Sequence, residues 1–196
     1  MALMLTSLAA NSMTTLTPGG KNFMATLPGA EVIPFVGGKG IFDPMDICPE
    51  AKEEALMYRE AELTHCRVAM MGTLGYLVQS HFSPMFQMDG ALVIRQLDLV
   101  LQSSIGQLGS STLLMAIFFS EIYRARTGWM EPDEEIRTLR PNYTPGDLGF
   151  DPLSLKPKDE AGLFAMQEKE LRNGRLAMIA IAGMTVQELT TGQQVF

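Results

Sequence analysis

The chain contains an internal duplication. When the sequence is offset by 108 positions, residues 42–79 align with residues 150–187 without a gap. The two segments are identical at 13 of 38 positions, where chance would give roughly two or three, and self-similarity of this kind indicates repeated structural units. We therefore expect two equivalent units, with the residues between them outside the pair.

Three stretches of the sequence are predicted to form long helices. They cover residues 53–80, 104–124 and 161–190, and the middle stretch has no counterpart in the duplication. At about 1.5 Å per residue, each is long enough to cross a hydrocarbon layer about 30 Å thick. None contains an uncharged apolar run of about 18 residues, which is the usual mark of a membrane span. A soluble helical bundle is therefore an open alternative.

Composition and charge narrow the class of protein. A hydrophobic content of 46 %, with 15 methionines beside 22 acidic residues, indicates apolar segments separated by charged loops. The formal net charge of −7 argues against a nucleic-acid partner, because no basic stripe is present to neutralise phosphates. The two cysteines, Cys48 and Cys66, cannot form a disulfide framework.

The basic residues are distributed unevenly among the predicted loops. Eleven Lys and Arg residues lie before the first stretch, between the second and third, or in the adjoining ends of the three stretches, whereas the connection between the first and second holds Arg95 alone. Three membrane spans would place these eleven cations on the side of the N-terminus, as the positive-inside rule requires. We therefore expect an all-α membrane protein with three transmembrane helices. Residues 1–40 would form an extended N-terminal arm, a possible targeting remnant, and residues 41–196 the helical domain.

Each repeat carries a Glu five residues before an Arg: Glu62 and Arg67 in the first, Glu170 and Arg175 in the second. Five residues place two side chains about 140° apart around a helix, so the members of one repeat cannot face each other. A lone charge inside a bilayer costs on the order of 3 kcal/mol. If the two repeats cross about a pseudo-twofold axis, each Glu meets the Arg of the other repeat.

Small residues recur at every third position of both repeats. Small side chains on one stripe let two membrane helices approach closely, because dispersion contacts replace the missing hydrophobic driving force. The two stripes occupy the same repeat positions, which favours a helix contact over chance. Their members are Cys66, Ala69, Gly72 and Gly75 in the first repeat and Gly174, Ala177, Ala180 and Gly183 in the second.

Side chains with a free lone pair also occur at matched positions. Three residues after each Glu comes His65 or Asn173, and seventeen residues after it comes Gln79 or Gln187. Such groups suit one axial bond to a magnesium ion whose other ligands come from a macrocycle. A glutamate can likewise give one oxygen to the metal and the other to an arginine, which leaves the site neutral.

The segments "ELTHCRVAMMG" and "ELRNGRLAM" resemble the two signatures of the light-harvesting chlorophyll-binding superfamily. The resemblance covers about residues 38–190. It implies three transmembrane helices, with the first and third crossed and held together by Glu–Arg pairs in which Arg67 and Arg175 are the cations. It also implies carotenoids in the grooves of the cross and chlorophylls bound through axial side chains.

Carried over by position, the resemblance implies a set of chlorophyll magnesium ligands. In the middle helix, "SEIYRARTGW" is similar to a family segment whose Glu is a ligand. Gln79 is a candidate by its symmetry with Gln187, and His81 is either a ligand or an interfacial histidine at a helix end. The implied ligands in order are Glu62, His65, Glu121, Glu170, Asn173 and Gln187.

The short loops and the segment "PGDLGFDPLSLKP" are similar to chlorophyll a/c antennae of red-lineage algae, such as diatoms, haptophytes, cryptophytes and dinoflagellates. The resemblance then implies chlorophyll a, chlorophyll c and xanthophylls of the fucoxanthin, peridinin, alloxanthin or diadinoxanthin kind, with bound lipids. The segments "EIYRARTGW" and "FDPLSLKP" favour members attached to photosystem I.

We therefore predict a light-harvesting antenna rather than an enzyme. It would be a multi-pass protein of the chloroplast thylakoid membrane with its N-terminus on the stromal side. It would pass excitation to a photosystem core, photosystem I rather than II, beside other antenna subunits and thylakoid lipids.

Two alternatives stay open. A stress-type, photoprotective member that dissipates excitation would share every motif, and acidic lumen-facing residues that sense pH would distinguish it. Asp89 and Asp98 are expected on that side, but two carboxylates are too few to decide. A small transporter or membrane enzyme that uses Glu and Arg as a proton relay would be colourless when purified.

Overall fold

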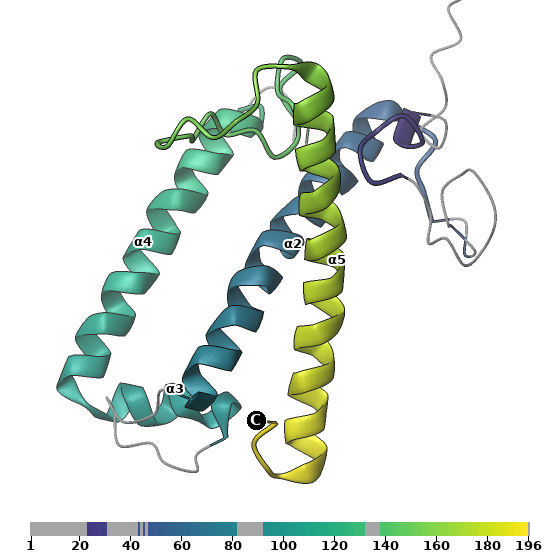
Figure 1. Cartoon of the computed structure of the whole chain (residues 1–196). Coiled ribbons are helices and arrows are strands. Elements are labelled where there is room, and N and C mark those ends of the chain that lie inside the picture. Colours follow the sequence, from purple (N-terminus) through teal and green to yellow (C-terminus); the bar gives the residue numbers. More distant parts are fainter. Residues whose placement is uncertain are drawn as a thin grey trace, which may run out of the picture.

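The described part of the chain is helical. In the computed structural model, the described residues are 23–30, 43, 45, 47–81, 92–131 and 138–195. They form α2 (Lys52–His81), α3 (Val93–Gln102), α4 (Ser104–Gly128) and α5 (Glu160–Thr191), as Figure 1 shows. The β-structure among these residues is one isolated bridge, between Trp129 and Leu139. The predicted all-α class is confirmed for the described residues.

The three predicted long helices are present. Helix α2 begins at Lys52 and α5 at Glu160, each one residue before the predicted start, and α4 continues to Gly128 rather than residue 124. Helix α3 was not predicted. Its apolar residues at positions 93, 94, 97, 100 and 101 follow a helical period, but a run of ten residues is too short for periodicity alone to identify.

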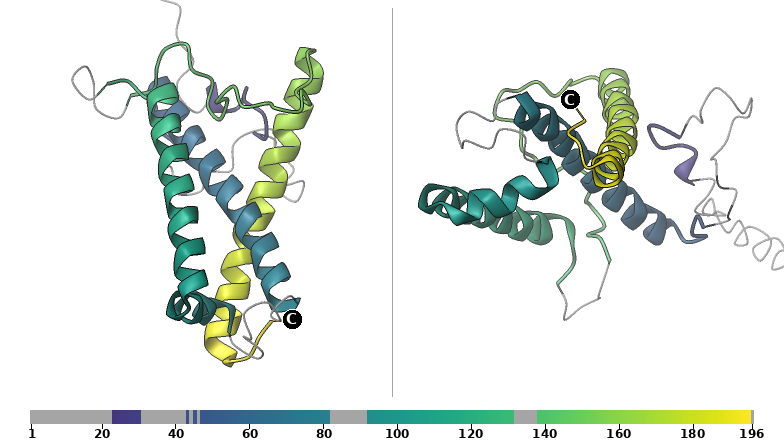
Figure 2. Two further views of the ribbon diagram at one scale, coloured as in Figure 1. Left: turned by 90° about the vertical axis from the view of Figure 1, so that its left-hand side faces the viewer. Right: turned by 90° about the horizontal axis from the view of Figure 1, so that it is seen from below.

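Helices α2 and α5 cross each other at a point where small residues meet (Figure 2, left). Cys66 and Ala177 are buried there, and a Cβ added to Gly174 would lie 2.3 Å from the Cβ of Cys66. Further along the two stripes the helices separate, since a Cβ at Gly75 or Gly183 would contact nothing within 4 Å. The small residues therefore permit a close crossing at one point rather than contact along the whole stripe.

Asp43 and Asp151, at equivalent positions of the two repeats, accept the same pair of backbone hydrogen bonds. Asp43 accepts hydrogen bonds from the backbone N–H groups of Ile47 and Cys48, both at 2.9 Å. Asp151 accepts from the N–H groups four and five residues later, both at 3.0 Å. The acceptor and donors occupy equivalent repeat positions, so the duplication extends from the helices into the turns that precede them.

Helix α4 runs beside the crossed pair (Figures 1 and 2). Its side chains are largely exposed along its middle. Leu113, Leu114 and Phe119 each remain more than 60 % exposed. Among the described helices, α4 is the one that is long and apolar enough to cross a membrane by length and composition. The prediction that α2 and α5 also span a membrane, related by a pseudo-twofold axis, stays a prediction.

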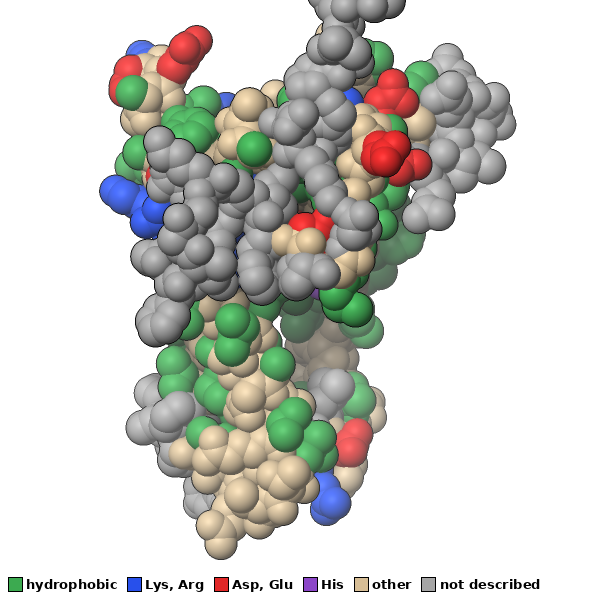
Figure 3. Space-filling view, turned by 90° about the vertical axis from the view of Figure 1, so that its right-hand side faces the viewer, with side chains coloured by type: hydrophobic (Ala, Val, Ile, Leu, Met, Phe, Trp, Pro, Cys, Tyr) green, Lys and Arg blue, Asp and Glu red, His purple; other side chains and the backbone are tan. Residues whose placement is uncertain are grey.

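Charged side chains lie near the two ends of the face shown in Figure 3, most of them at the upper end. The upper end carries the start of α5, and the middle of this face shows hydrophobic and uncharged groups. Most of the predicted arm, residues 1–22 and 31–40, lies outside the described residues. Segment 23–30 lies near the upper end of α5, where the Gly29 carbonyl accepts a hydrogen bond from Arg175 Nη1 at 2.7 Å.

At the lower end, Glu188 of α5 connects three helices. Its side chain is fully buried, accepts the backbone N–H of Val93 in α3 at 2.7 Å, and also bonds the hydroxyl of Tyr76 in α2. These contacts hold α3 across the end of the crossed pair. They were not predicted, because the sequence does not show which of its acidic residues will be buried.

Candidate functional site

Two ion pairs join α2 and α5 beside the point where they cross. Arg67 Nε donates to Glu170 Oε1 at 2.7 Å, and Arg175 Nε donates to Glu62 Oε1 at 2.8 Å. All four side chains are partly exposed. The structure thus brings each Glu together with the Arg of the other repeat, as expected from the duplication.

Each of these arginines also donates to the backbone of a loop. Arg67 Nη2 donates to the carbonyl of Gly146 at 2.9 Å, which matches the bond from Arg175 to Gly29. Each guanidinium therefore connects a carboxylate on the opposite helix with a loop carbonyl. Because a guanidinium presents several donors in a rigid plane, one arginine can hold a helix and a loop together.

The two loop glycines occupy similar positions against the helices. Gly29 has φ +72° and Gly146 has φ +82°, both in the left-handed region that disfavours other residues. A Cβ at Gly29 would lie 2.9 Å from Leu171, and one at Gly146 would lie 2.7 Å from Leu63. Because Leu63 and Leu171 are equivalent repeat positions, both repeats use the same leucine and arginine to hold a glycine loop.

The candidate ligand carboxylates differ in how many of their oxygens are occupied. Within the described residues, Arg67 occupies one oxygen of Glu170, Oε1, and Arg124 donates from two nitrogens to one oxygen of Glu121, Oε2. Glu62 is held at both oxygens, because Arg59 Nη1 donates to its Oε2 at 3.0 Å. Glu170 and Glu121 therefore match the expected arrangement of one oxygen on arginine and one available for a metal.

Arg59 is a site residue that the sequence-based prediction missed. It is 5 % exposed, and its Nε is buried without a hydrogen-bond partner among the described residues. Its counterpart in the second repeat is Gln167, so the duplication gave no signal for it. Its bond to Glu62 leaves that carboxylate less free than Glu170.

The geometry of His65 fixes its tautomer. Its Nδ1 lies 2.7 Å from the carbonyl oxygen of Ala61, which can only accept, so Nδ1 carries the proton. In the neutral ring Nε2 then holds the free lone pair, and the side chain is exposed on the outside of α2. This arrangement fits an axial metal ligand oriented by its second nitrogen.

The remaining candidate ligands also lie on the outside of the helices. Asn173 and Gln187 of α5 and Gln79 of α2 are exposed, so their amide oxygens can reach a bound group. His81 ends α2, and its side chain lies outside the described part of the structure. In that part, no group of three or more His, Cys, Asp and Glu side chains could hold a metal ion. Among the described residues, the candidates therefore lie singly rather than in one cluster.

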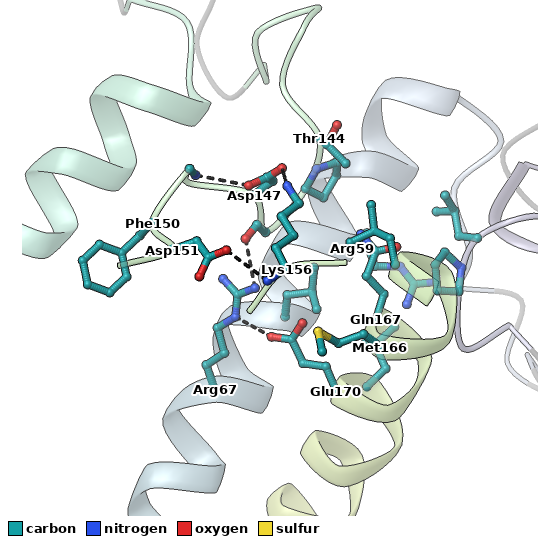
Figure 4. A pocket seen from close by; sticks show the side chains of 18 of the residues that line it. Arg59, Arg67, Thr144, Asp147, Phe150, Asp151, Lys156, Met166, Gln167 and Glu170 are labelled. Carbon is teal, nitrogen blue, oxygen red and sulfur yellow. Dashed lines mark hydrogen bonds and ion pairs between the residues drawn. The ribbon is translucent and has the colours of Figure 1, made fainter. Parts of the chain in front are cut away.

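A pocket of about 550 Å³ lies between the N-terminal halves of α2 and α5 and loop 144–156 (Figure 4). Glu170 and Arg67 form one wall, and Asp147, Asp151 and Lys156 lie on the loop opposite them. Apolar side chains of both helices, of the loop and of segment 23–30 complete the lining. The volume is typical of a site for a small organic molecule.

Hydrogen bonds set the ionisation of the loop acids. Lys156 Nζ lies 2.5 Å from Asp147 Oδ2, and this bond lowers the pKa of the Asp147 carboxyl. The N–H groups of Lys156 and Leu155 lower the pKa of Asp151 in the same way. The loop wall of the pocket therefore stays charged at neutral pH, with one cation and two carboxylates.

Comparison with known proteins identifies similar chains. The model of the family described as "Chlorophyll A-B binding protein" matches residues 23–189. Light-harvesting complex stress-related protein 3.2 of Chlamydomonas reinhardtii is 42 % identical over 179 residues, which cover 89 % of this chain and 67 % of that protein. A fucoxanthin-chlorophyll a-c binding protein of Isochrysis galbana is 41 % identical over 165 residues, covering 78 % and 74 %.

A third relative is more distant. The photosystem I chlorophyll a/b-binding protein 5 of Arabidopsis thaliana is 30 % identical over 188 residues, covering 84 % of this chain and 70 % of that protein. The family match starts at residue 23. It therefore includes the described segment 23–30 that contacts Arg175.

Proposed function

Because the chain belongs to the chlorophyll a/b-binding family of light-harvesting proteins, we propose that it holds chlorophylls and carotenoids in the thylakoid membrane and dissipates excess excitation. Members of this family bind pigments and are not enzymes, so no turnover chemistry is assigned. The observation that carries the dissipating role is the 42 % identity to a stress-related protein over 89 % of the chain. The family also argues against a transporter.

The chain's own residues supply the pigment sites in this proposal. A bound chlorophyll brings a magnesium ion that needs one axial donor. Glu170, Glu121 and His65 each present one atom with a free lone pair. The other carboxylate oxygen of each Glu is bonded to an arginine, and the other ring nitrogen of His65 is bonded to a backbone carbonyl. Asn173, Gln187 and Gln79 offer amide oxygens, and Glu62 offers the remaining lone pair of an occupied oxygen.

The pocket beside Glu170 would accommodate the polar end of a pigment whose apolar body extends along the groove of the crossed helices. Its apolar walls and alternating charges suit a molecule with one polar end. The pigment types proposed are chlorophyll a, chlorophyll c and a xanthophyll of the fucoxanthin kind. They are supported by the fucoxanthin-chlorophyll a-c binding relatives.

The membrane orientation follows from charge. Six Lys and Arg residues lie before α2 or between α4 and α5, five more lie in the adjoining parts of these helices, and Arg95 alone lies in the connection between α2 and α4. Three spans would place the cation-rich end in the stroma and α3 at the lumen. Lengths of 30, 25 and 32 residues for α2, α4 and α5 exceed what a bilayer requires.

The test is the chlorophyll fluorescence lifetime of the purified pigment-protein at neutral pH and at about pH 5.5, where carboxylates with raised pKa values take up protons. A dissipating protein has a shorter lifetime in acid. The comparison uses one detergent and one protein concentration, because aggregation also shortens lifetimes. An equal, long lifetime at both pH values would contradict the dissipating role.

The second candidate is an antenna that feeds a photosystem, photosystem I in particular. The 41 % identity to a fucoxanthin-chlorophyll a-c binding protein and the 30 % identity to a photosystem I protein support it. The measurement is the excitation spectrum of photosystem I emission in membranes with and without this chain. A contribution from its pigments, together with co-purification, would favour this role.

A further inference from the structure

A buried carboxylate on α2 lies outside the pigment ligands considered above. Glu60 is 2 % exposed. Its Oε2 accepts the backbone N–H of Gly146 at 2.7 Å and the hydroxyl of Tyr143 at 3.1 Å. Its Oε1 lies 3.5 Å from Nη1 of Arg124, a residue of α4. Glu60 therefore contacts both the loop after α4 and α4 itself.

Arg124 connects this carboxylate with the candidate ligand of α4. Its Nη1 donates to the hydroxyl oxygen of Thr64 on α2 at 3.1 Å. Its Nε and Nη2 donate to Glu121 Oε2 at 3.1 and 2.7 Å. One guanidinium thus lies between Glu121 on its own helix and Glu60 and Thr64 on another.

The equivalent carboxylate of the second repeat has a different partner. The position equivalent to Glu60 is Glu168, which forms an ion pair with Arg172 on its own helix, one turn later. The position equivalent to Arg172 is Thr64. Since Thr64 carries no charge, Glu60 has no cation of its own helix at that position, and Arg124 supplies one from α4. The two repeats differ where the unduplicated helix attaches.

We propose that Glu60 and Thr64 form the docking site that holds α4 against α2 and thereby positions Glu121, a positioning role that rests on the proposed ligand function of Glu121. The contact is sensitive because few others hold α4. Its middle is exposed, and it meets the rest of the described chain mainly at its ends. A charge-assisted contact at one end therefore has a large influence on where Glu121 lies.

The charge of Arg124 is shared between two carboxylates, and this leaves one oxygen of Glu121 available for a metal. Glu60 and Glu121 share the positive charge of Arg124, and the N–H of Gly146 and the hydroxyl of Tyr143 support Glu60 from the other side. Docking fixes the Arg124 guanidinium, which occupies one oxygen of Glu121. The other oxygen then keeps a defined direction. Without the docking site, Arg124 and Glu121 would still pair, but they would move with α4.

The test combines two variants that keep side-chain shape. Glu60→Gln removes the charge, and Thr64→Val removes the hydroxyl that accepts from Arg124. Spin labels at exposed positions 54 and 126 report the distance between α2 and α4 in the pigment-loaded protein. The background carries Cys48→Ser, and Cys66 is fully buried. We expect both variants to raise the population of molecules with longer label distances on the order of tenfold. This is the change expected from the loss of one hydrogen bond to a charged group.

Matched controls separate docking from general loss of stability. Glu168→Gln changes the equivalent residue of the second repeat, whose ion pair lies on one helix, and should leave the label distance unchanged. Thr64→Ser keeps the hydroxyl that accepts from Arg124, so its label distance should match that of the unchanged protein. The absorption difference of Glu60→Gln should peak in the same band as that of Glu121→Leu, because both act on one pigment.

The outcomes distinguish the inference from the function on which it rests. Unchanged label distances in both variants would overturn the docking site, even if Glu121→Leu removes a pigment. Longer distances support the docking site, and if Glu121→Leu then leaves the pigment content unchanged, the proposed ligand role of Glu121 fails instead. Should Glu60→Gln fail to refold, Thr64→Val carries the same comparison.

Discussion

Arg67 and Arg175 have equivalent roles in the two repeats, since each joins a carboxylate of the opposite helix to a glycine carbonyl. Replacing Arg67 by Leu would leave Glu170 without its cation beside the membrane interior. An unpaired charge there costs on the order of 3 kcal/mol. We expect Arg67→Leu to reduce the yield of refolded pigment-protein sharply, measured by sucrose-gradient separation from free pigment.

A double variant identifies the cause of that loss. Arg67→Leu combined with Glu170→Gln removes the unpaired charge of Glu170. The helix content of the double variant should therefore recover, even though the proposed ligand Glu170 is changed. Arg172→Leu is the control, because Arg172 is largely exposed and pairs with Glu168 on its own helix. Equal losses for Arg67→Leu and Arg172→Leu would show that the inter-helix pair has no special role.

His65 tests a single ligand. Its Nδ1 is held by the Ala61 carbonyl, and Nε2 is free. We expect His65→Leu to lose one chlorophyll per protein while the helices remain. His65→Asn should keep that chlorophyll, because the second repeat has Asn173 at the equivalent position. Pigment extraction with chromatography gives the stoichiometry, and an unchanged chlorophyll content in His65→Leu would remove this residue from the ligands.

At the residue scale, the duplication predicted which partners meet, but not every residue that takes part. The pairs of Glu62 and Glu170 follow from two motifs that have the same Glu–Arg spacing and face each other. Arg59 and Glu60 lie within three residues of Glu62, yet their roles depend on contacts that one repeat has and the other lacks. A sequence pattern that repeats cannot reveal a contact that does not repeat.

At the scale of elements, the crossing of α2 and α5 depends on Gly174. A Cβ there would lie 2.3 Å from the Cβ of Cys66, closer than real contacts allow. We expect Gly174→Ala to destabilise the protein by about 1–3 kcal/mol, the usual cost of overpacking. Gly183→Ala is the control, because a Cβ there has open space, and alanine favours a helix by up to about 1 kcal/mol. Thermal melting followed by circular dichroism measures both.

The opposite order of stability would contradict the close crossing. If Gly183→Ala were the more damaging change, the helices would meet nearer the lower end than the structure shows. The small-residue pattern predicted that α2 and α5 approach each other. It did not predict where, because eight small positions fit either a long parallel contact or a single crossing.

Helices α3 and α4 show the limits of prediction for whole elements. Helix α4 was predicted from its length and composition, but its place beside α2 was not, since it has no partner in the duplication. Helix α3 was missed because ten residues give too little periodicity. Its position is fixed by Val93 and the buried Glu188, which are 95 residues apart in the sequence.

At the scale of the whole molecule, the two ends differ in charge. The cation-rich end holds loop 138–159, where bonds to Lys156 and to backbone N–H groups lower the pKa values of Asp147 and Asp151. Burial and the charge of Glu60 raise the pKa of Tyr143 to about 12. The uneven distribution of basic residues in the sequence places most of them at this end. Asp98 lies exposed on α3 at the other end, and Asp89 lies outside the described residues.

These shifts define the pH range over which loop 138–159 stays in place. A lowered pKa means that the two aspartates contribute stability above their ordinary value of 3.8, which is lost as the pH falls through the lowered values. The raised pKa of Tyr143 means that its contribution is complete below its ordinary value of 10.0 and is lost as the pH rises through about 12. Between these limits, the loop should not respond to acid.

We therefore expect that mild acid, about pH 5.5, leaves amide hydrogen exchange in residues 143–156 unchanged after correction for the intrinsic rate, because the loop carboxylates are still ionised there. We then expect any acid-induced drop in fluorescence lifetime to arise outside residues 143–156. Asp147→Asn should therefore retain the drop. Loss of the drop in Asp147→Asn would place the acid response in this loop and contradict the expectation.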